Sequence, residues 1–376
     1  MRVPPKLHFL QPDQLKLVSD WKYLAEGSHR RCLLLEAVAR DLPRIPSFRL
    51  GRRPVPRRPL RVTGSAVHHS VLHNAMVIGR GVVADAEGGL LIDSVSGLGK
   101  GADNNLAAHV AAVGLVWREN VLCTPAWCRG PPVAHIREPL FHLLNGRDQN
   151  YTHFLFEVLP KLAFRQAMPA PRPRLLVSAA VARSFGWLFS ALGVGEDEML
   201  VAPEAGWLRV DEIHVAGEPG WQHQGVMRAL RDLVAGETPV DRARIYIRRI
   251  GTKAWARPLL NETAVIERLV ARGFRIIVPE SLPREEQMAV MRSADVIAGV
   301  YGGGLLNSLF CPPGTKVLSL TSTGYWRSSL DSAANSLDLR VVEVVGDCFL
   351  ARHDPNNSAF VLDLDALDAA CDALDL

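Results

Sequence analysis

The feature that most constrains the fold of this 376-residue chain is a regular alternation of strand-like and helix-like segments after about residue 150. Neighbouring parallel strands need a crossover connection, usually a helix, so strict alternation predicts parallel sheets with helices on both faces. The alternation forms two series, over residues 151–235 and 245–345. Because this length exceeds one ordinary core, we predict an α/β fold with two Rossmann-like lobes and a cleft between them.

The expected elements follow from apolar runs bounded by Gly, Pro and polar residues. In the first series we expect helices over Tyr151–Gln166 (kinked at Pro160), Val181–Leu192 and Val226–Ala235, and strands over Arg174–Ser178, Met199–Ala202 and Leu208–Ala216. In the second we expect strands over Ile245–Arg248, Phe274–Val278, Asp295–Val300, Lys316–Leu320 and Arg340–Val345. Its helices are expected over Glu262–Ala271, Pro283–Arg292, Leu305–Phe310 and Tyr325–Ser336, with a closing helix within Leu362–Leu376.

The chain before this alternation has a different composition. Asp41–Pro59 is dense in Arg and Pro, and because proline opposes helix and central strand we interpret the segment as an exposed connector. Val71–Val95 has short apolar runs split by Gly and Asp and is expected to be rich in β-strand. We therefore expect three parts: a basic arm with a β-rich extension over residues 1–100, one lobe over 101–235 and a second over 236–376.

Positive charge is concentrated at the N-terminus. The whole chain has a net charge of +4, whereas residues 1–61 carry 14 Lys and Arg against 5 Asp and Glu, a net +9. Such a segment suits contact with an anionic membrane surface or an acidic polymer, and a solvated arm is the alternative. The chain has neither aromatic-interleaved basic strands nor zinc-finger spacing, so we expect no nucleic-acid partner.

The six cysteines are scattered, which is not the pattern of a disulfide framework, and no second pair completes a zinc set with Cys123 and Cys128. No apolar run approaches the length of a membrane span, and the first 20 residues lack an apolar signal core. These features predict a cytoplasmic protein, peripheral to the inner membrane in the case that the basic arm binds it.

The strongest local signal is "DVIAGVYGGGLLNSLF", residues 295–310, where an apolar strand runs into Gly302, Gly303 and Gly304 and then into a helix. Glycines let a ligand approach the backbone closely, and a helix start offers free N–H groups with partial positive charge. Together they predict a phosphate-binding loop. The alternative is a tight strand-to-helix turn without a ligand, which three glycines alone do not exclude.

A second signal is "IYIRRIGTKAWARPLLNE", residues 245–262, where a strand ends in Arg248 and Arg249, and Lys253 and Arg257 follow in a loop. Ligands of α/β sheets sit at this edge, and a guanidinium can grip a diphosphate with paired hydrogen bonds. We expect Arg249 to bind phosphate, whereas we interpret Lys253 as a solvated residue of a basic loop.

The third signal is "NYTHFLFEVLP", residues 150–160. His153 and Glu157 are four residues apart and share one face of the predicted helix. A carboxylate orients a neighbouring imidazole and suits it to act as a general base. Two alternatives stay open: Glu157 pairs with Lys161 one turn on, and His153 is a satisfied core residue.

At these three stretches the chain resembles glycosyltransferase family 61, in particular bacterial members of the capsular polysaccharide biosynthesis type. "NYTHFLFEVLP" is similar to the family's N-Y-x-H-W-x-x-E-x-L-P stretch, and "IYIRR" with Arg257 and Asn261-Glu262 is similar to its Y-I-S-R…R-x-x-x-N-E run. Residues 273–320 resemble the family's most specific block, with matches at Glu280, Gln287, Gly299, Asn307, Phe310 and Pro313-Gly314. Residues 79–95, "GRGVVADAEGGLLIDSV", show a weaker likeness.

The resemblance implies a GT-B arrangement, an inverting mechanism, a nucleotide-sugar donor, a glycan or lipid-linked glycan acceptor, and no required metal or cofactor. It implies a role in capsular or extracellular polysaccharide synthesis. Residues 101–235 would be the acceptor lobe, with His153 and Glu157 as catalytic residues, and residues 236–376 the donor lobe. The donor-binding residues would be Arg249, Arg257, Glu280, Tyr301, Gly302, Gly303, Gly304, Leu305 and Asn307.

Three positions depart from the family pattern. Tyr301 stands where a His is usual, Arg248 where a Ser precedes the arginine, and Ser319 where a Glu often ends the next strand. Two rival functions therefore stay open. One is a nucleotide-sugar-binding or assembly protein without catalysis, which Tyr301 and Ser319 motivate. The other is an NAD-dependent oxidoreductase on a Rossmann fold.

Overall fold

A computed structural model describes residues 30–64, 66–85, 91–94, 116–118, 121–123, 131–219, 223–234, 242–250, 257–325, 329–349 and 357–376. Contacts within the chain separate two compact units. Unit 1 comprises Met1–Val38 and Gly64–Gly220, and unit 2 comprises Ala39–Thr63 and Trp221–Leu376. The domain boundaries expected at residues 100 and 235 stay predictions.

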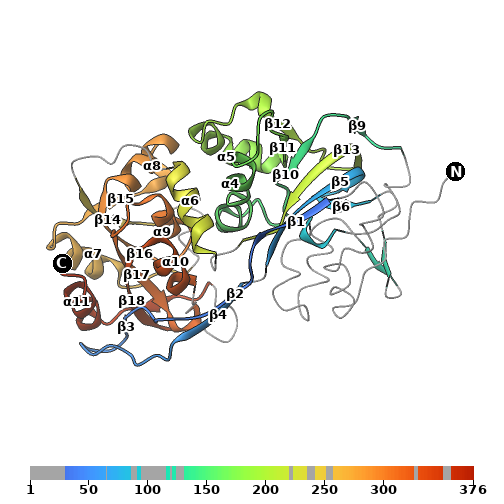
Figure 1. Ribbon diagram of the computed structural model, residues 1–376. Helices are drawn as coiled ribbons and strands as arrows, with labels where there is room; N and C mark the ends of the chain where they lie inside the picture. Colours follow the sequence, from blue (N-terminus) through green and yellow to red (C-terminus); the bar gives the residue numbers. More distant parts are fainter. Residues whose placement is uncertain are drawn as a thin grey trace. The chain divides into compact units, whose positions relative to one another are not determined.

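Unit 1 is built on a mixed sheet (Figure 1). Its strands lie in the order β1 (Arg30–Leu35), β5 (Val67–Ile78), β13 (Trp207–Ala216), β10 (Leu140–His142), β11 (Arg174–Val177) and β12 (Met199–Val201), with β6 (Val82–Ala84) beside β5 and β9 (Ala134–Ile136) beside β13. The strands from β13 to β12 are parallel, whereas β5 is antiparallel to β13. Buried residues form unbroken runs in β10 and β11, as expected for strands that are covered on both faces. Along β5 they are interspersed with more exposed residues, as expected for a strand covered on one face.

The helices predicted in the first series are confirmed. Tyr151–Gln166 forms three consecutive segments: α3 (Tyr151–His153), a π-helical turn η4 (Phe154–Val158) and α4 (Lys161–Gln166). Pro160 precedes α4, where its missing N–H costs no helical hydrogen bond. The next helix, α5 (Ala179–Ala191), begins where Ser178 accepts a hydrogen bond from the Val181 N–H, and it ends before Gly193, whose φ is +73°.

Unit 2 contains a second sheet. Its described strands lie in the order β15 (Arg275–Ile277), β14 (Ala243–Ile247), β16 (Ala294–Val300), β17 (Lys316–Ser322), β18 (Arg340–Cys348) and β19 (Phe360–Val361), and β3 (Ser47–Phe48) also pairs with β18. All of these pairings are parallel except that of β18 with β19. The strands predicted in the second series are confirmed, and their order is the doubly wound 2-1-3-4-5 arrangement.

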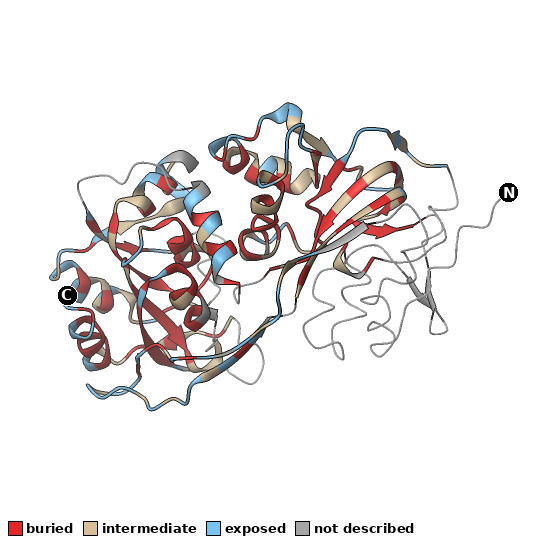
Figure 2. Ribbon diagram, viewed as in Figure 1, coloured by how far each residue is buried: buried red, intermediate tan, exposed pale blue. Residues whose placement is uncertain are grey.

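The helices that connect these strands lie on both faces of the sheet, with α7 (Glu262–Val270) on one face and α8 (Arg284–Arg292), α9 (Gly303–Leu306) and α10 (Ser329–Leu337) on the other (Figure 1). The C-terminal α11 (Leu364–Asp372) shares a buried apolar core with α7 and the central strands, which Figure 2 shows as buried. The helix expected over Leu305–Phe310 begins earlier, at Gly303, and continues as the 3-10 turn η8 (Asn307–Phe310). Tyr325 belongs to a separate turn, η9 (Thr323–Tyr325). The helix expected over Val226–Ala235 is α6 (Gln224–Val234), which packs against α10 in unit 2.

The interpretation of Asp41–Pro59 as an exposed connector is wrong for its centre. Ser47 and Phe48 form β3 beside β18, and Phe48 is only 6% exposed. Arg57 secures this edge by donating to Ser47 Oγ at 2.9 Å and to Glu343 at 3.3 Å. The surrounding prolines are tolerated because β3 is short, so few backbone N–H groups must join the ladder. Residues 39–63, called the strap below, thus belong to unit 2.

The β-structure expected within Val71–Val95 is confirmed by β5 and β6, which are followed by a 3-10 turn at Ile92–Ser94. No helix among the described residues has the length and apolar character needed to cross a bilayer.

We predict that Phe48→Ala destabilises unit 2. The Phe48 side chain belongs to the core of this unit, and truncating a buried Phe to Ala costs about 3–5 kcal/mol. Urea unfolding measures the change. Leu50→Ala is the control on the same strap, because Leu50 is 64% exposed, and it should unfold like the parent. Equal unfolding midpoints for the two variants would mean that the strap contributes nothing to the core.

Candidate active site

The strand order of unit 2 determines where a ligand is expected. In the order β15-β14-β16-β17-β18, successive connections reverse direction between β14 and β16. Ligands of doubly wound sheets bind at the carboxyl ends of the strands at such a switch point. Arg249 follows the end of β14, and Gly302 follows the end of β16. Ile247 pairs with Gly299, so the two strand ends are level with each other.

Two guanidinium groups converge on the backbone of Gly302. A Cβ at this position would lie 3.0 Å from Nη2 of Arg249 and 3.1 Å from Nη2 of Arg257. Glycine leaves room for both groups, which any side chain would have to displace. The structure thus brings together three of the predicted donor-binding residues from two separate loops.

The helix after this loop contributes less than the sequence suggested. α9 has four residues and passes directly into η8, so its dipole is weaker than that of a full helix. Gly303 and Gly304 are partly exposed. A Cβ at Gly304 would lie 3.2 Å from Ile247 Cγ2, which gives this glycine a packing role as well. The positive potential of the loop therefore comes mainly from the two arginines.

Tyr325 is a component of this site that sequence analysis missed. The Arg257 guanidinium carbon lies 4.1 Å from the centre of the Tyr325 ring, a cation–π distance. The same ring packs against Tyr301, with 5.7 Å between the ring centres. Tyr325 N donates to Ser322 Oγ at 3.2 Å, and its carbonyl accepts from Thr321 Oγ1 at 3.1 Å, so the turn that carries the ring is itself held.

Arg257 has a strained backbone. Its φ is +58°, in the left-handed region that is unfavourable for a residue with a side chain. Such a conformation persists only where surrounding contacts determine it, and here the Tyr325 ring and the approach to Gly302 supply them. The strain therefore marks Arg257 as a positioned residue rather than a loosely solvated one.

The electrostatics of the loop favour an anion. Burial, and then the charge of Arg257, lower the pKa of Arg249, while Glu280 acts in the opposite direction. Glu280 is exposed in η7 (Pro279–Ser281), which follows β15. An arginine stays charged under all ordinary conditions. A diphosphate between the two guanidinium groups would relieve their repulsion and accept charge-assisted hydrogen bonds from both.

The other predicted donor-binding residues differ in what they can offer a ligand. Leu305 is 1% exposed, so its backbone rather than its side chain can take part. Asn307 and Tyr301 are each 6% exposed, at the foot of the loop. Asn307 can still offer a polar group, whereas Tyr301 packs its ring against Tyr325.

Arg248 does not join the site. Its Nε lies 3.5 Å from Glu262, which also accepts a hydrogen bond from the buried Tyr246 hydroxyl at 2.9 Å. The two neighbouring arginines at the end of β14 therefore point to different elements. Arg248 contacts Glu262 at the start of α7, and Arg249 approaches Gly302. Lys253 lies outside the described residues.

His153 and Glu157 form the predicted pair in unit 1. His153 Nδ1 lies 2.9 Å from Glu157 Oε1, although the segment between them is π-helical. The side chains of His153 and Glu157 are 27% and 12% exposed, so the interpretation of His153 as a core residue is wrong. With Nδ1 facing the carboxylate, Nε2 is the ring nitrogen that can face a ligand hydroxyl.

A partly buried polar cluster adjoins this pair. Asn145 Nδ2 donates to Glu157 Oε2 at 3.4 Å and to Glu218 Oε1 at 3.1 Å. Lys161 is 2% exposed, and burial lowers its pKa, opposed first by Glu218, then by Asp93 and then by Glu157. Glu157 thus acts electrostatically on Lys161, in the direction that the alternative of a Glu157–Lys161 pair proposed, but Glu218 and Asp93 act on Lys161 more strongly. No sequence pattern pointed to Asn145, Glu218 or Asp93, because they are far apart along the chain.

Among the described residues, no group of three His, Cys, Asp or Glu side chains is arranged to hold a metal ion. Nitrogen atoms of His69 and His214 are 3.1 Å apart, and His214 also contacts Glu212 at 2.9 Å. Burial and His214 lower the pKa of His69 to about 4, so this ring is neutral at pH 7. The expectation that the protein needs no metal stays a prediction.

Most residues of the candidate site lie within the part of the chain that is similar to known proteins. Residues 151–318 match the family model "Glycosyltransferase 61", a range that includes His153, Glu157, Arg249 and Gly302. Over 123 residues the chain is 33% identical to a rice protein (Oryza sativa subsp. japonica) named beta-1,2-xylosyltransferase XAX1. This similarity covers 31% of the chain and only 21% of the rice protein.

We predict that Tyr325→Leu weakens binding of inorganic pyrophosphate, used as a diphosphate probe. Loss of a cation–π contact of roughly 0.5–2 kcal/mol should release Arg257 and weaken binding by roughly two- to thirtyfold. Calorimetric titration measures the affinity. Tyr325→Phe keeps the ring and should bind like the parent. An equal loss in the Phe variant would show that the ring face is not what positions Arg257.

Proposed function

Because residues 151–318 of this chain match the model of glycosyltransferase family 61, we propose that the protein moves a sugar from a nucleotide-sugar donor to a glycan or lipid-linked glycan acceptor, with inversion at the anomeric carbon. The observation that carries the proposal is the convergence of Arg249 and Arg257 on Gly302 at the switch point of the unit 2 sheet. The likeness to bacterial family members favours capsular or extracellular polysaccharide synthesis and a GT-B arrangement of the two lobes.

Unit 2 holds the donor diphosphate in this proposal. As the bond between the anomeric carbon and the diphosphate oxygen breaks, negative charge grows on the leaving group. Guanidinium groups that are already in place stabilise that charge without reorganising. Asn307 and the partly exposed backbone of Gly303 and Gly304 add hydrogen-bonding groups, and no metal ion or cofactor is needed. In this proposal Glu280, which is exposed in the turn after β15, accepts hydrogen bonds from donor hydroxyls.

His153 is the proposed general base. Its Nε2 accepts the proton of the acceptor hydroxyl while that oxygen forms a bond to the anomeric carbon. Glu157, 2.9 Å from Nδ1, orients the ring and stabilises the imidazolium that results. Attack from the face opposite the leaving diphosphate gives inversion.

The comparisons suggest which sugar to test first. The rice relative is named as a xylosyltransferase, so we propose a xylose-bearing nucleotide as the first donor of a panel. The alternative, a nucleotide-sugar-binding or assembly protein without catalysis, rests on Tyr301, whose ring packs against Tyr325 where the family usually has His. Donor binding without hydrolysis or transfer by the purified protein would favour that alternative.

We further propose that the protein is cytoplasmic and peripheral to an anionic membrane. The support is the net +9 of residues 1–61. Part of this charge is already neutralised within unit 2, since Arg49 and Arg52 pair with Asp347 and Asp372. The attraction available from the strap is therefore smaller than the residue count implies.

We predict that Arg249→Ala weakens nucleoside-diphosphate binding by about 1.5–3 kcal/mol, the contribution of a hydrogen bond to a charged group. Arg248→Ala is the matched control, because the neighbouring guanidinium faces Glu262, and it should bind like the parent. Calorimetry with UDP and GDP, and with NAD for comparison, measures the affinities. Tighter binding of NAD than of either diphosphate would favour the oxidoreductase alternative, and equal affinity of both variants would place the diphosphate elsewhere.

We predict that His153→Ala and Glu157→Gln each lower the rate of sugar transfer by roughly 10²–10⁴-fold, the usual contribution of a positioned general base. Donor affinity should barely change, because neither residue belongs to unit 2. The double variant should lose little more than the worse single variant, since residues that act as a unit are not additive. His135→Ala, at an exposed histidine paired with Asp211, is the control. Near-normal transfer in both single variants would remove the pair from the mechanism.

A further inference from the structure

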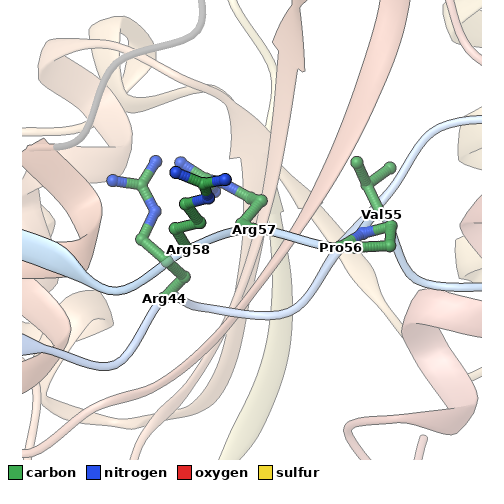
Figure 3. Close-up of a pocket in the computed structure, with 5 residues that line it drawn as sticks. All are labelled: Arg44, Val55, Pro56, Arg57 and Arg58. Carbon is green, nitrogen blue, oxygen red and sulfur yellow. The ribbon is translucent and has the colours of Figure 1, made fainter.

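The strap forms a cavity of its own on unit 2. The cavity has a volume of about 430 Å³ and is lined by Arg44, Val55, Pro56, Arg57 and Arg58 (Figure 3). Figure 3 shows the three guanidinium groups gathered at one end, with Val55 and Pro56 at the other. All three arginines belong to residues 1–61, which carry a net charge of +9.

Two of these arginines are anchored from behind by buried carboxylates. Asp331 on α10 is fully buried, and it lies 3.4 Å from Arg44 Nε and 3.5 Å from Arg57 Nη2. Glu343 on β18 lies 3.3 Å from Arg57 Nη1. The Arg57 side chain is only 10% exposed, so its guanidinium is fixed rather than free to sweep through solvent. The cavity wall is therefore a built feature of the fold.

The anchors do not balance the charge or use all of the hydrogen-bond donors. Three guanidinium groups face two carboxylates, which leaves a net charge of +1. Arg44 makes an ion pair with Asp331, but its buried Nε has no hydrogen-bond partner among the described residues. Among the described residues, Arg58 has no hydrogen-bond or ion-pair partner. Each guanidinium carries five N–H donors in a planar fork, a geometry that matches phosphate oxygens.

We propose that this cavity is a second anion site, separate from the loop at Gly302, that binds a phosphate group through Arg44 and Arg58. Arg57 serves as the buried support that keeps the two binding guanidinium groups in place. The ligand chemistry is a phosphate monoester, diphosphate or free phosphate, whose oxygens accept paired hydrogen bonds from the arginines. A lipid headgroup and a soluble phosphate compound are the two sources of such a group.

The test removes the Gly302 loop from the measurement. In an Arg249→Ala, Arg257→Ala background, calorimetric titration with inorganic pyrophosphate should still show one site, and its affinity should fall with added salt. Arg58→Gln and Arg44→Gln in this background should each weaken binding about tenfold, the effect of losing one charge-assisted hydrogen bond near the surface. Cooperative urea unfolding confirms that each variant is folded, and Arg58→Gln should keep the midpoint of the background, whereas Arg44→Gln should lower it because Asp331 loses a partner.

Arg53→Gln is the matched control, because Arg53 is an exposed arginine of the same strap outside the cavity lining. It should leave pyrophosphate affinity unchanged. No pyrophosphate binding in the background, or an equal loss in the Arg53 and Arg58 variants, would overturn the proposal. The donor-site proposal is tested separately, by Arg249→Ala in the otherwise unchanged chain. The donor-site proposal and the proposal of a second anion site can therefore fail independently.

The source of the phosphate is read from a vesicle assay with phosphatidylcholine containing phosphatidic acid. Co-sedimentation that falls in Arg58→Gln and is displaced by pyrophosphate would support the site and identify a lipid headgroup. Co-sedimentation insensitive to Arg58, together with Arg58-dependent pyrophosphate binding, would support the site and identify a soluble phosphate.

Discussion

The approach of two guanidinium groups to one glycine is the interaction on which the proposed donor site depends. Nη2 of Arg249 and of Arg257 each lie about 3 Å from the same point, so they are within about 6 Å of each other. At an effective dielectric constant of about 20, repulsion at that separation is on the order of 3 kcal/mol. The Tyr325 ring against Arg257 and the Glu280 carboxylate near Arg249 offset part of it. A diphosphate would turn the remaining repulsion into attraction, which makes this arrangement selective for a doubly charged ligand.

Much of unit 2 could be predicted because its signals are local. Each apolar run of the second series became a strand, since a strand buried on two faces needs only a short unbroken run of apolar residues. The same pattern placed Arg249 and Gly302 at strand ends, where parallel topology brings side chains together. The 2-1-3-4-5 order itself could not be derived, because alternation is equally compatible with other doubly wound orders. That order is what makes β14 and β16, rather than other strands, the neighbours at the switch point.

The parts that could not be predicted depend on contacts between distant segments. Tyr325 lies in a 3-10 turn without periodicity, and only the fold shows that its ring meets Arg257. The strap has a composition typical of an exposed segment, yet Arg57 and two buried carboxylates from α10 and β18 hold it at the sheet edge. The density of proline and arginine indicates only the intrinsic conformational preference of a segment. The strap instead packs on unit 2 because its partners, about 270 to 290 residues away in the sequence, bind Arg57.

The same argument explains why the His153–Glu157 pair is more than a chance spacing. A fully buried lysine is costly unless carboxylates compensate its charge, and Lys161 requires Glu218, Asp93 and Glu157 for that purpose. Two interactions therefore restrain the Glu157 carboxylate. It compensates part of the Lys161 charge, and its Oε1 lies 2.9 Å from His153 Nδ1. Asn145 bridges the Glu157 and Glu218 carboxylates and separates two like charges. A carboxylate held in this way cannot rotate freely to solvent, so it presents the imidazole in one orientation, which a general base needs if its Nε2 is to meet the acceptor hydroxyl.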